Sequence, residues 1–368
     1  MAGVYVHVPF CHAKCWYCDF YSMPLQPAAE QWLDATLNEW EQRREELDSP
    51  LNTLYIGGGT PSSIPTELLS KLIDTLRSPS MKEITVEVNP EDMTRELASA
   101  LVEHGVNRVS MGVQSLIDCE LEAVGRRHTA ADAINAVSIL REAGVKNISL
   151  DLIYGLPLQT LDSWQQSVEG IIALHPEHLS AYSLSYEPGT RLTTRLNCGK
   201  IRETPQEVSE AMYRYLCHRL GASGYEHYEI SNFALPYCKS IHNSSYWNMT
   251  PYLGLGPSAH SYTGGTRKFN PGSLKQYLLQ NGVVWQEEDE TDLERFNDYV
   301  MVRLRTAEGI DLDDAARRFG SRAKELIYNT AAPYLNSGQM QLTPGGALRI
   351  SEESWIVSDG IMCEFMQV

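Results

Sequence analysis

The first two-thirds of the sequence alternates short apolar runs with longer stretches of helical periodicity. Six runs rich in β-forming residues each precede a helical pattern. The runs cover residues 5–8, 54–56, 84–88, 109–113, 148–153 and 179–184. The helical patterns cover residues 30–47, 68–76, 94–104, 130–143, 161–174 and 207–220. Strands that alternate with helices predict a parallel sheet with crossover helices, which is the α/β class.

A sheet of this kind is either doubly wound and open or closed into a barrel. The polar and glycine-rich residues all fall at the carboxyl ends of the predicted strands. In a barrel these ends form one rim, where active sites are built. A doubly wound sheet gathers its ligand residues at one switch point instead. Six units are fewer than the eight of a closed barrel, so we predict a partial (β/α)6 barrel of the TIM type with room for a large ligand.

Three cysteines, Cys11, Cys15 and Cys18, follow the first predicted strand with the spacing Cys-x3-Cys-x2-Cys. Thiolates are ligands of iron–sulfur clusters, and three of them leave one iron of a four-iron cluster open. A small molecule with an amino and a carboxylate group could chelate that iron, as S-adenosylmethionine does for radical chemistry. Zinc also accepts this spacing, with His7 or His12 as the fourth ligand. Spacing alone favours a cluster and leaves zinc, or three unligated thiols, open.

Further polar residues mark the rim of the predicted barrel. The run Gly57–Pro61 follows the second strand, and its glycines could bring backbone amides close to a ligand or simply form a tight turn. Glu87 lies near the end of the third strand, where it could bind ribose hydroxyls or pair with a structural arginine. Gln114 ends the fourth strand, Asp151 lies in the fifth, and Arg126 precedes a helix. Together they suit a nucleoside-bearing cofactor across the barrel mouth.

The segment 225–270 does not follow the alternation of strand and helix seen in the preceding units. Residues 225–230 alternate like a strand, and residues 231–270 are loop-like but rich in aromatic side chains. Within them, His242 lies close to Trp247 and could be an axial ligand of haem iron between flat aromatic walls. On the residues alone, a histidine hydrogen-bonded inside a packed loop is the favoured alternative, and a metal pair with Cys238 is a third.

The last part of the chain is acidic and helical. Helices are predicted at 291–305, 311–319 and 322–335, and residues 341–350 read as a small hairpin. This order resembles a winged-helix module, although the fold alone does not imply DNA binding. We therefore predict three parts: 1–265 as the barrel with the haem-motif segment, 266–290 as a connector, and 291–368 as a small helical, winged-helix-like C-terminal domain.

Composition narrows the classes of function. The 368 residues carry a formal net charge of -17, which argues against a general nucleic-acid binder. The eight cysteines are too diluted for a secreted disulfide scaffold, so a reducing cytoplasm is expected. The first residues do not read as a signal peptide. No stretch is long and apolar enough to predict a membrane span.

Several motifs together resemble a known family over nearly the whole chain. In order they are Tyr-Val-His-Val-Pro-Phe-Cys-x3-Cys-x2-Cys, Gly-Gly-Gly-Thr-Pro, Glu-Val-Asn-Pro, Gly-Val-Gln-Ser, Gly-Arg-Arg-His, Asp-Leu-Ile-Tyr-Gly-Leu-Pro and Gly-Leu-Gly-Pro-Ser-Ala-His-Ser. They resemble the radical SAM proteins related to oxygen-independent coproporphyrinogen III oxidase. The resemblance implies a [4Fe-4S] cluster on Cys11, Cys15 and Cys18. Around S-adenosylmethionine it implies Tyr5, Tyr17, Gly58, Gly59, Thr60, Glu87, Gln114, Arg126 and Asp151.

Two departures separate this chain from the oxidase. The oxidase has a further cysteine two residues after the third, where this chain has Phe20, and a long segment ahead of the first strand, where only four residues precede Tyr5. Both departures resemble the haem chaperone branch of the family, which also carries the His-Asn-x2-Tyr-Trp motif seen here at 242–247. The resemblance therefore makes His242 the expected haem ligand, with His260 or Cys238 as candidates for the second axial position.

The resemblance implies a protein that binds haem and transfers it to proteins of the respiratory chain. Its cluster and S-adenosylmethionine would serve as a structural or switching element rather than in coproporphyrinogen III decarboxylation. The alternative is the oxidase reaction itself, a radical oxidative decarboxylation. The resemblance also implies a homodimer and peripheral association with membranes. A nucleic-acid role for the C-terminal domain is not expected.

Overall fold

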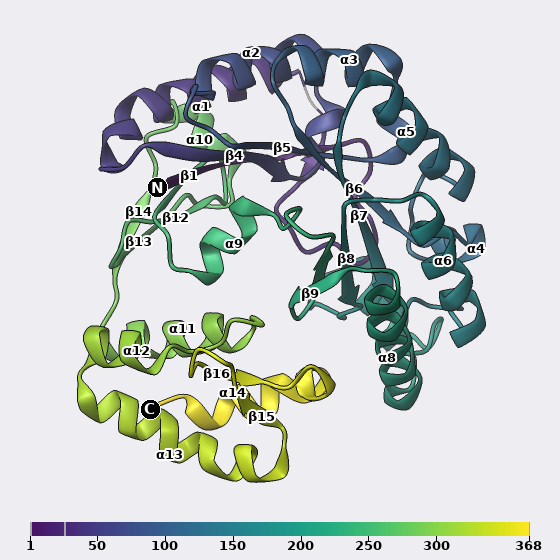
Figure 1. Cartoon of the computed structure of the whole chain (residues 1–368). Helices are drawn as coiled ribbons and strands as arrows, with labels where there is room; N and C mark the ends of the chain where they lie inside the picture. The colour runs from purple at the N-terminus through teal and green to yellow at the C-terminus, as the bar shows by residue number, and fades with distance from the viewer. Residues whose placement is uncertain (1, 26, 368) are drawn as a thin grey trace.

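One twelve-stranded sheet organises the molecule. The computed structural model describes residues 2–25 and 27–367. The strand order is β14-β13-β12-β11-β1-β4-β5-β6-β7-β8-β10-β9. Figure 1 shows this sheet curving around a central space, with helices on its outer side. The α/β fold and the partial barrel predicted from the sequence are confirmed.

Six parallel strands form the centre of the sheet in their order along the chain. They are β1 (Ala2–Val8), β4 (Leu51–Gly58), β5 (Glu83–Val88), β6 (Arg108–Gln114), β7 (Asn147–Tyr154) and β8 (His178–Ser183). Each of the first five contains one predicted run, and β8 covers all but the last residue of the sixth, 179–184. The helices outside them are α1 (Ala29–Arg43), α2 (Thr66–Leu76), α3 (Arg95–Glu103), α4 (Asp118–Ala123), α5 (Ala130–Ala143), α6 (Leu161–Ala173), α7 (Arg191–Asn197) and α8 (Gln206–Ala222).

Several of the outer helices begin at threonine side chains that cap them. Thr94 accepts a hydrogen bond from the amide of Leu97 at the start of α3. Thr129 and Thr160 begin α5 and α6 with full capping boxes. Such caps satisfy amides that have no partner within the helix. Threonines at these points set where each helix can begin after its strand.

The strands have an apolar outer face and a polar inner face. On β1, Val4, Val6 and Val8 are fully buried in the main core between sheet and helices. The alternate residues point inward, because successive side chains of a strand face opposite sides. The inner face carries buried polar groups, among them Thr53, Glu83, Thr85, Arg108, Ser110, Ser149, His178 and Ser180. Buried polar groups must find partners, so this interior positions side chains as well as filling space.

The sheet continues beyond the six parallel strands at both ends. At one end β11 (Tyr252–Leu255) pairs parallel with β1, followed by the antiparallel strands β12 (His260–Tyr262), β13 (Thr266–Phe269) and β14 (Gln286–Asp289). At the other end β10 (Asn232–Ala234) pairs with β8 and with β9 (Glu226–Glu229). The strand predicted at 225–230 is thus confirmed.

The loop predicted at 231–270 is wrong. That range holds β10, helix α9 (Ile241–Trp247), β11, β12 and β13. These strands are short, and their hydrogen bonds come from an existing sheet edge rather than from local propensity. The predicted connector, 266–290, contains β13, α10 (Leu274–Leu279) and β14. The division into three parts stays a prediction.

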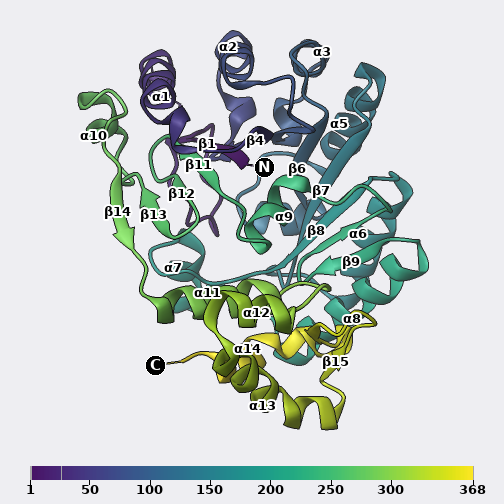
Figure 2. The ribbon, with the colours of Figure 1, turned by 60° about the vertical axis from the view of Figure 1, so that its left-hand side comes forward.

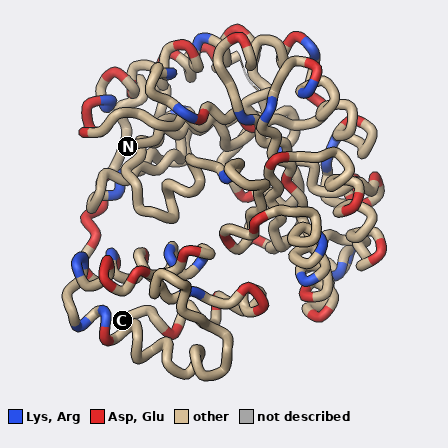
Figure 3. The backbone as a smooth tube through the Cα atoms, in the orientation of Figure 1, with Lys and Arg blue, Asp and Glu red and all other residues tan. Residues whose placement is uncertain are grey.

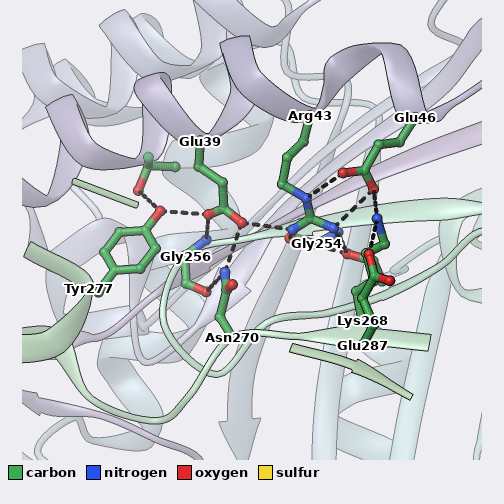
Figure 4. Close-up of polar contacts among 11 residues, drawn as sticks. Glu39, Arg43, Glu46, Gly254, Gly256, Lys268, Asn270, Tyr277 and Glu287 are labelled. Carbon is green, nitrogen blue, oxygen red and sulfur yellow. Dashed lines mark hydrogen bonds and ion pairs between the residues drawn. The ribbon is translucent and has the colours of Figure 1, made fainter. Parts of the chain in front are cut away.

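A buried polar network ties α1 to these added strands (Figure 4). The Arg43 guanidinium donates to Glu39 at 2.8 Å and to the carbonyl of Gly254 at 3.2 Å. Glu39 also accepts from the amide of Gly256 at 2.9 Å and from the Tyr277 hydroxyl at 2.7 Å. Both members of the Glu39–Arg43 pair are almost fully buried. Such a pair is tolerated only when further hydrogen bonds satisfy it, as here.

The C-terminal part lies below the barrel in Figure 1, and Figure 2 shows it against the lower end of the sheet near α8. It contains α11 (Asp292–Leu304), α12 (Leu312–Phe319), α13 (Ser321–Ser337), β15 (Met340–Leu342), β16 (Leu348–Ile350), the 3-10 helix η4 (Glu352–Val357) and α14 (Ser358–Phe365). The three predicted helices and the hairpin are confirmed, and α14 was not predicted.

Positively and negatively charged residues alternate along the outer helices (Figure 3). In the C-terminal part, Arg317 and Arg318 both pair with Asp314. Among the described residues, no helix has the length and apolar character needed to cross a bilayer.

Candidate functional site

A cavity of about 500 Å³ lies at the carboxyl ends of the parallel strands. The sequence places the predicted cofactor residues there, and the structure brings most of them together. The lining includes Cys11, Cys15, Cys18, Tyr17, Gly58, Gly59, Thr60, Glu87, Gln114, Arg126 and Asp151. Tyr5 and His242 are the two predicted site residues that do not line it. The volume suits a cofactor-sized ligand.

The cysteine loop is fixed at both ends. Its start, β2 (Phe10–Cys11), pairs with its end, β3 (Met23–Pro24). In the middle, the Trp16 ring packs against the guanidinium groups of Arg191 and Arg195, at 4.3 and 4.6 Å from the ring centre. Cation–π contacts of this kind hold a loop that has little secondary structure of its own. The thiols are therefore presented to the cavity by a pinned loop.

The spacing of the three sulfurs does not suit a single zinc ion. Among the described residues, the three sulfurs are not a group whose ligand atoms all lie within 4.8 Å of one another. Zinc holds sulfur at about 2.3 Å, which requires sulfurs closer together than that. A four-iron cluster is larger and takes each cysteine on a different iron. Burial raises the pKa of Cys11, and it raises the pKa of Cys18 to about 11.

Arg126 connects the cysteine loop to two strand ends. Its guanidinium donates to the Cys15 sulfur at 3.4 Å and to the side-chain oxygen of Asn89 at 3.0 Å, and it also contacts the carbonyl of Gly112. A fixed fork of donors is what allows one arginine to satisfy three partners. A donor to a cluster sulfur is one of the groups by which a protein tunes an iron–sulfur centre.

The glycine run and Glu87 fit together closely. The Glu87 carboxylate accepts from the Gly58 amide at 3.1 Å and from the Tyr55 hydroxyl at 2.7 Å. A side chain on Gly57 would place its Cβ atom 2.8 Å from that carboxylate. Gly58 has φ +109°, a conformation that favours glycine. Gly57 is therefore required by the position of Glu87 and not only by a turn.

Two carboxylates at this site hold their protons more strongly than usual. Burial raises the pKa of Glu87 to about 7, with the charge of Asp151 as a further cause. Burial likewise raises the pKa of Asp151, which accepts from the Ser110 hydroxyl at 3.3 Å. Raised pKa values at a cavity wall are typical of functional sites. The structural arginine considered as a partner for Glu87 is not in hydrogen-bonding contact with it.

Gln114 adopts a left-handed backbone conformation. Its φ is 67°, and the pairing of β6 with β7 shifts register between Gly112 and Gln114. This conformation costs a non-glycine residue on the order of 1 kcal/mol, and such strain concentrates at functional sites. The bulge directs the end of β6 toward the cavity, where Gln114 and Gly112 both lie.

Tyr5 lies outside the cavity lining, in the barrel interior. Its hydroxyl is 3.1 Å from the Nδ1 atom of His7, and its ring lies 6.1 Å from the ring of Tyr55. Tyr55 in turn donates to Glu87. Tyr5 thus supports the cavity wall through its neighbours, and its predicted contact with a cofactor stays a prediction.

His242 is buried at the opposite end of the barrel. Its Nδ1 atom is 2.8 Å from the Thr53 hydroxyl, and its Nε2 atom is 2.9 Å from the Tyr246 hydroxyl. The residue is 1% exposed and stacks on Tyr55 with ring centres 5.1 Å apart. Burial lowers its pKa to about 3. The neutral ring has a partner at each nitrogen, as in the hydrogen-bonded alternative, but it lies on helix α9 and not in a loop.

The helix that carries His242 closes the amino end of the barrel. The Glu83 carboxylate at the start of β5 accepts from the amides of Ile241 and His242 at 2.8 and 2.9 Å. Gly3, near the start of β1, also lies against the His242 ring. Of the second-ligand candidates, His260 is on β12 with an exposed side chain, and Cys238 precedes α9.

Sequence reasoning missed several residues of the cavity wall, among them Asn89, Ser110 and Tyr182. Asn89 accepts from Arg126, Ser110 donates to Asp151, and Tyr182 lines the cavity from β8. Asn89 belongs to the Glu-Val-Asn-Pro motif, which is a signal that could have identified it. Ser110 shares its strand face with Gln114, four residues on, so the period of two could have found it.

The cavity lining combines two cationic side chains, three carboxylates and three thiols. Arg126 could face a carboxylate of a ligand, and Glu87 or Asp151 could accept from hydroxyl or amino groups. These are the groups that S-adenosylmethionine carries, so the residues present fit that cofactor. The sulfur spacing fits a cluster better than zinc.

Comparison with known proteins agrees with this chemistry. A profile described as the Radical SAM superfamily matches residues 5–171. The protein named "Heme chaperone HemW" of Bacillus subtilis (strain 168) is 38% identical, over 87% of this chain and 87% of that protein. This chain belongs to the HemW family. The HemW protein of Mycobacterium tuberculosis (strain CDC 1551 / Oshkosh) is 33% identical over 94% of this chain and 92% of its own length.

The HemW fold is also found in a solved structure. That structure is described as "Coproporphyrinogen III oxidase (HemN) from Escherichia coli is a Radical SAM enzyme". It covers 100% of this chain and 90% of its own, with a TM-score of 0.84 and 24% identity. At this identity the likeness shows a shared fold alone. The predicted family and the predicted fold are both confirmed.

Proposed function

We propose that the chain is a haem chaperone that binds haem and transfers it to respiratory acceptor proteins. It would carry a [4Fe-4S] cluster on Cys11, Cys15 and Cys18, and S-adenosylmethionine in the adjoining cavity. The proposal is carried by the match of relatives named haem chaperones to most of the chain. It is supported by the three cysteines, which open onto a cavity lined by eight of the nine predicted cofactor residues.

The roles of the cavity residues follow from their contacts. The cluster, when bound, supplies an open iron to which an amino acid group can bind. Arg126, which donates to Cys15, would stabilise negative charge on that sulfur and face a carboxylate of the ligand. Glu87 would accept from ribose hydroxyls, since its carboxylate is already oriented by Gly58 and Tyr55. Gln114 and Asp151 line the same cavity.

Phe20 supports the chaperone over the oxidase. It stands where the resemblance places a further cysteine in the oxidase, it lines the cavity, and it is 65% exposed. An exposed aromatic ring at a cavity mouth could pack against a flat ligand such as a porphyrin.

The haem ligand is a separate part of the proposal. Both ring nitrogens of His242 have partners in this structure, Thr53 and Tyr246. His242 could therefore ligate haem only after α9 leaves the end of the barrel and exposes the ring. His260, which is exposed, could ligate haem without such a change.

Anaerobic reconstitution with iron, sulfide, S-adenosylmethionine and haem tests the proposal in one sample. We expect haem bound per chain, transfer of that haem to an apo-acceptor, and no protoporphyrinogen when coproporphyrinogen III is added with a reductant. The Cys11→Ala, Cys15→Ala, Cys18→Ala variant is the control for cluster dependence. Formation of protoporphyrinogen would contradict the chaperone reading and support the oxidase. The homodimer, the membrane association and the cytoplasmic location also stay predictions.

A further inference from the structure

A second group of metal-ligand atoms lies far from the cysteine loop in the sequence. Cys217, His227 and Glu352 bring a sulfur, a ring nitrogen and a carboxylate oxygen within 4.8 Å of one another. The sulfur lies 3.9 Å from Nδ1 of His227, and that nitrogen lies 3.0 Å from the Glu352 carboxylate. Among residues 2–25 and 27–367, no other group of three meets this geometry. None of the three lines the cofactor cavity.

The orientation of the His227 ring directs Nδ1 toward the Cys217 sulfur and the Glu352 carboxylate. Its Nε2 atom lies 3.2 Å from the carbonyl oxygen of Ile230, so Nε2 carries a hydrogen and donates it. In the neutral ring the Nδ1 lone pair then points at a carboxylate and a sulfur, which are both electron-rich. A cation bound between these three atoms would offset the repulsion between their lone pairs. A histidine that donates its second nitrogen to a backbone carbonyl is the usual orientation of a metal ligand.

The ring is held in place by its neighbours. His227 stacks on Phe233 with ring centres 3.9 Å apart, and Trp355 packs edge-on at 4.2 Å. The His227 side chain is 5% exposed. The hydroxyl of Tyr213 donates to the same Ile230 carbonyl at 3.2 Å. A rigid, nearly buried imidazole with an oriented lone pair is a pre-organised ligand.

The three ligands come from both parts of the molecule. Cys217 is on α8 and His227 on β9, which both belong to the barrel, whereas Glu352 is the first residue of η4 in the C-terminal part. A metal bound here would cross-link the two parts. The Glu352 side chain is 55% exposed, so water has access to a fourth coordination position.

We propose that Cys217, His227 and Glu352 bind one divalent metal ion that fastens the C-terminal part to the barrel. A thiolate with an imidazole favours zinc among the common divalent metals. Zinc binds sulfur at about 2.3 Å and nitrogen or oxygen at about 2.0 Å, which fits between atoms spaced as these are. Binding releases the Cys217 thiol proton to solvent and involves no redox step. The site is independent of the proposed haem function.

Metal content and affinity test the site. The full-length Cys11→Ala, Cys15→Ala, Cys18→Ala protein removes zinc binding at the loop, and the cluster-loaded wild type is measured in parallel. After dialysis against zinc, we expect about one zinc per chain, with affinity measured by competition with a chromophoric chelator. Cys217→Ser and, separately, Glu352→Gln should weaken binding at least about tenfold. Cys363→Ser and Glu353→Gln are the control variants. Both change exposed residues of the C-terminal part and should leave the zinc affinity unchanged.

Cobalt gives a readout that a merely structural change would not mimic. With Co²⁺ in place of zinc, a sulfur-to-cobalt absorption band should appear in the near ultraviolet and should be absent in Cys217→Ser but present in Cys363→Ser. Glu352→Gln alters an exposed side chain and should remain folded, so loss of affinity in that variant reports the site itself. A protein that retains no zinc, or one whose zinc affinity is unchanged in Cys217→Ser, overturns the proposal and leaves a simple His227–Glu352 ion pair.

The cross-link has its own test. Hydrogen exchange of amides 350–357 should slow when zinc is bound and become several-fold faster when a chelator is added. In Glu352→Gln the chelator should have no effect on those amides. Equal exchange in wild type with and without zinc would overturn the fastening role even if metal binds.

Discussion

The Tyr55 side chain joins the two ends of the barrel interior: its hydroxyl donates to Glu87 at 2.7 Å, and its ring stacks on His242. Glu87 lines the cavity, whereas His242 belongs to the helix that closes the opposite end. A single side chain therefore separates the cofactor wall from the aromatic motif. Changes at either end should be felt through Tyr55.

Glu87 should give S-adenosylmethionine binding a pH dependence. Its pKa is raised to about 7, so the carboxylate is protonated below that pH and accepts hydrogen bonds less well. We expect the affinity of the wild type for S-adenosylmethionine to rise as the pH increases from 6 to 8. The Glu87→Gln variant should bind more weakly, and its affinity should not change over that range. Isothermal titration under anaerobic conditions measures both. An unchanged pH profile in Glu87→Gln would assign the ionisation to another group.

The same ionisation should affect stability with a defined sign. The folded pKa of Glu87 lies above its unfolded value, so the folded state binds more protons between about pH 4.5 and 7. Stability contributed by this group is present below that range and is lost as pH rises through about 7. Denaturant titrations at pH 5 and 7 should show this fall in the wild type and a smaller fall in Glu87→Gln.

Gly57→Ala should damage the cavity without touching the cluster ligands. The added methyl would lie 2.8 Å from the Glu87 carboxylate and push it out of position. We expect S-adenosylmethionine affinity to fall about tenfold, which corresponds to about 1.4 kcal/mol. Gly221→Ala on α8 is the matched control, since nothing lies within 4 Å of the added atom there. That control should be neutral or stabilise by up to about 1 kcal/mol.

Arg126→Lys should distinguish the effect of the positive charge at residue 126 from the effect of its hydrogen-bond geometry on the cluster. Lysine keeps the positive charge but loses the fork that reaches both Cys15 and Asn89. We expect a shifted reduction potential for the cluster, measured by an anaerobic redox titration followed by electron paramagnetic resonance. Arg127→Lys, on an exposed side chain, controls for the neighbouring charge. A potential unchanged in Arg126→Lys would show that the hydrogen bond to sulfur is not needed.

His242→Ala distinguishes a haem ligand from a structural residue. It removes a buried ring and two hydrogen bonds, so we expect unfolding to become easier by about 2–4 kcal/mol. His260→Ala, at an exposed position, should change stability by less than about 0.5 kcal/mol. Haem affinity is then compared at a temperature where both variants remain folded. Retained haem binding in His242→Ala, together with loss in His260→Ala, would move the ligand to β12.

The parts of the fold that periodicity predicts are those with their own local signal. The six apolar runs and the helices that follow them can be predicted because each carries its pattern within about twenty residues. Glu87, Gln114 and Asp151 could be predicted together because parallel strands end at one rim, whereas Tyr17 was implied only by the family resemblance. Individual contacts, such as Arg126 with Asn89, depend on side-chain directions that spacing does not encode.

The missed parts depend on distant partners. The short strands β11 and β12 form because β1 offers a free edge, nearly the whole barrel away in sequence. The environment of His242 is built by Thr53 and Glu83, from strands far earlier in the chain. Nothing near residue 242 indicates that its ring will be buried against them. A motif read from the sequence therefore revealed the residue but not its surroundings.

The position of β1 between β4 and β11 bears on how the protein is made. Strand β11 leaves the ribosome roughly 200 residues after β4, which at typical synthesis rates takes about 10–40 s. Throughout that time β1 has one unpaired edge, and such edges pair readily with other chains. The nascent chain therefore passes through a period in which the unpaired edge of β1 can pair with another chain. This period ends only when β11 has been synthesised and pairs with β1.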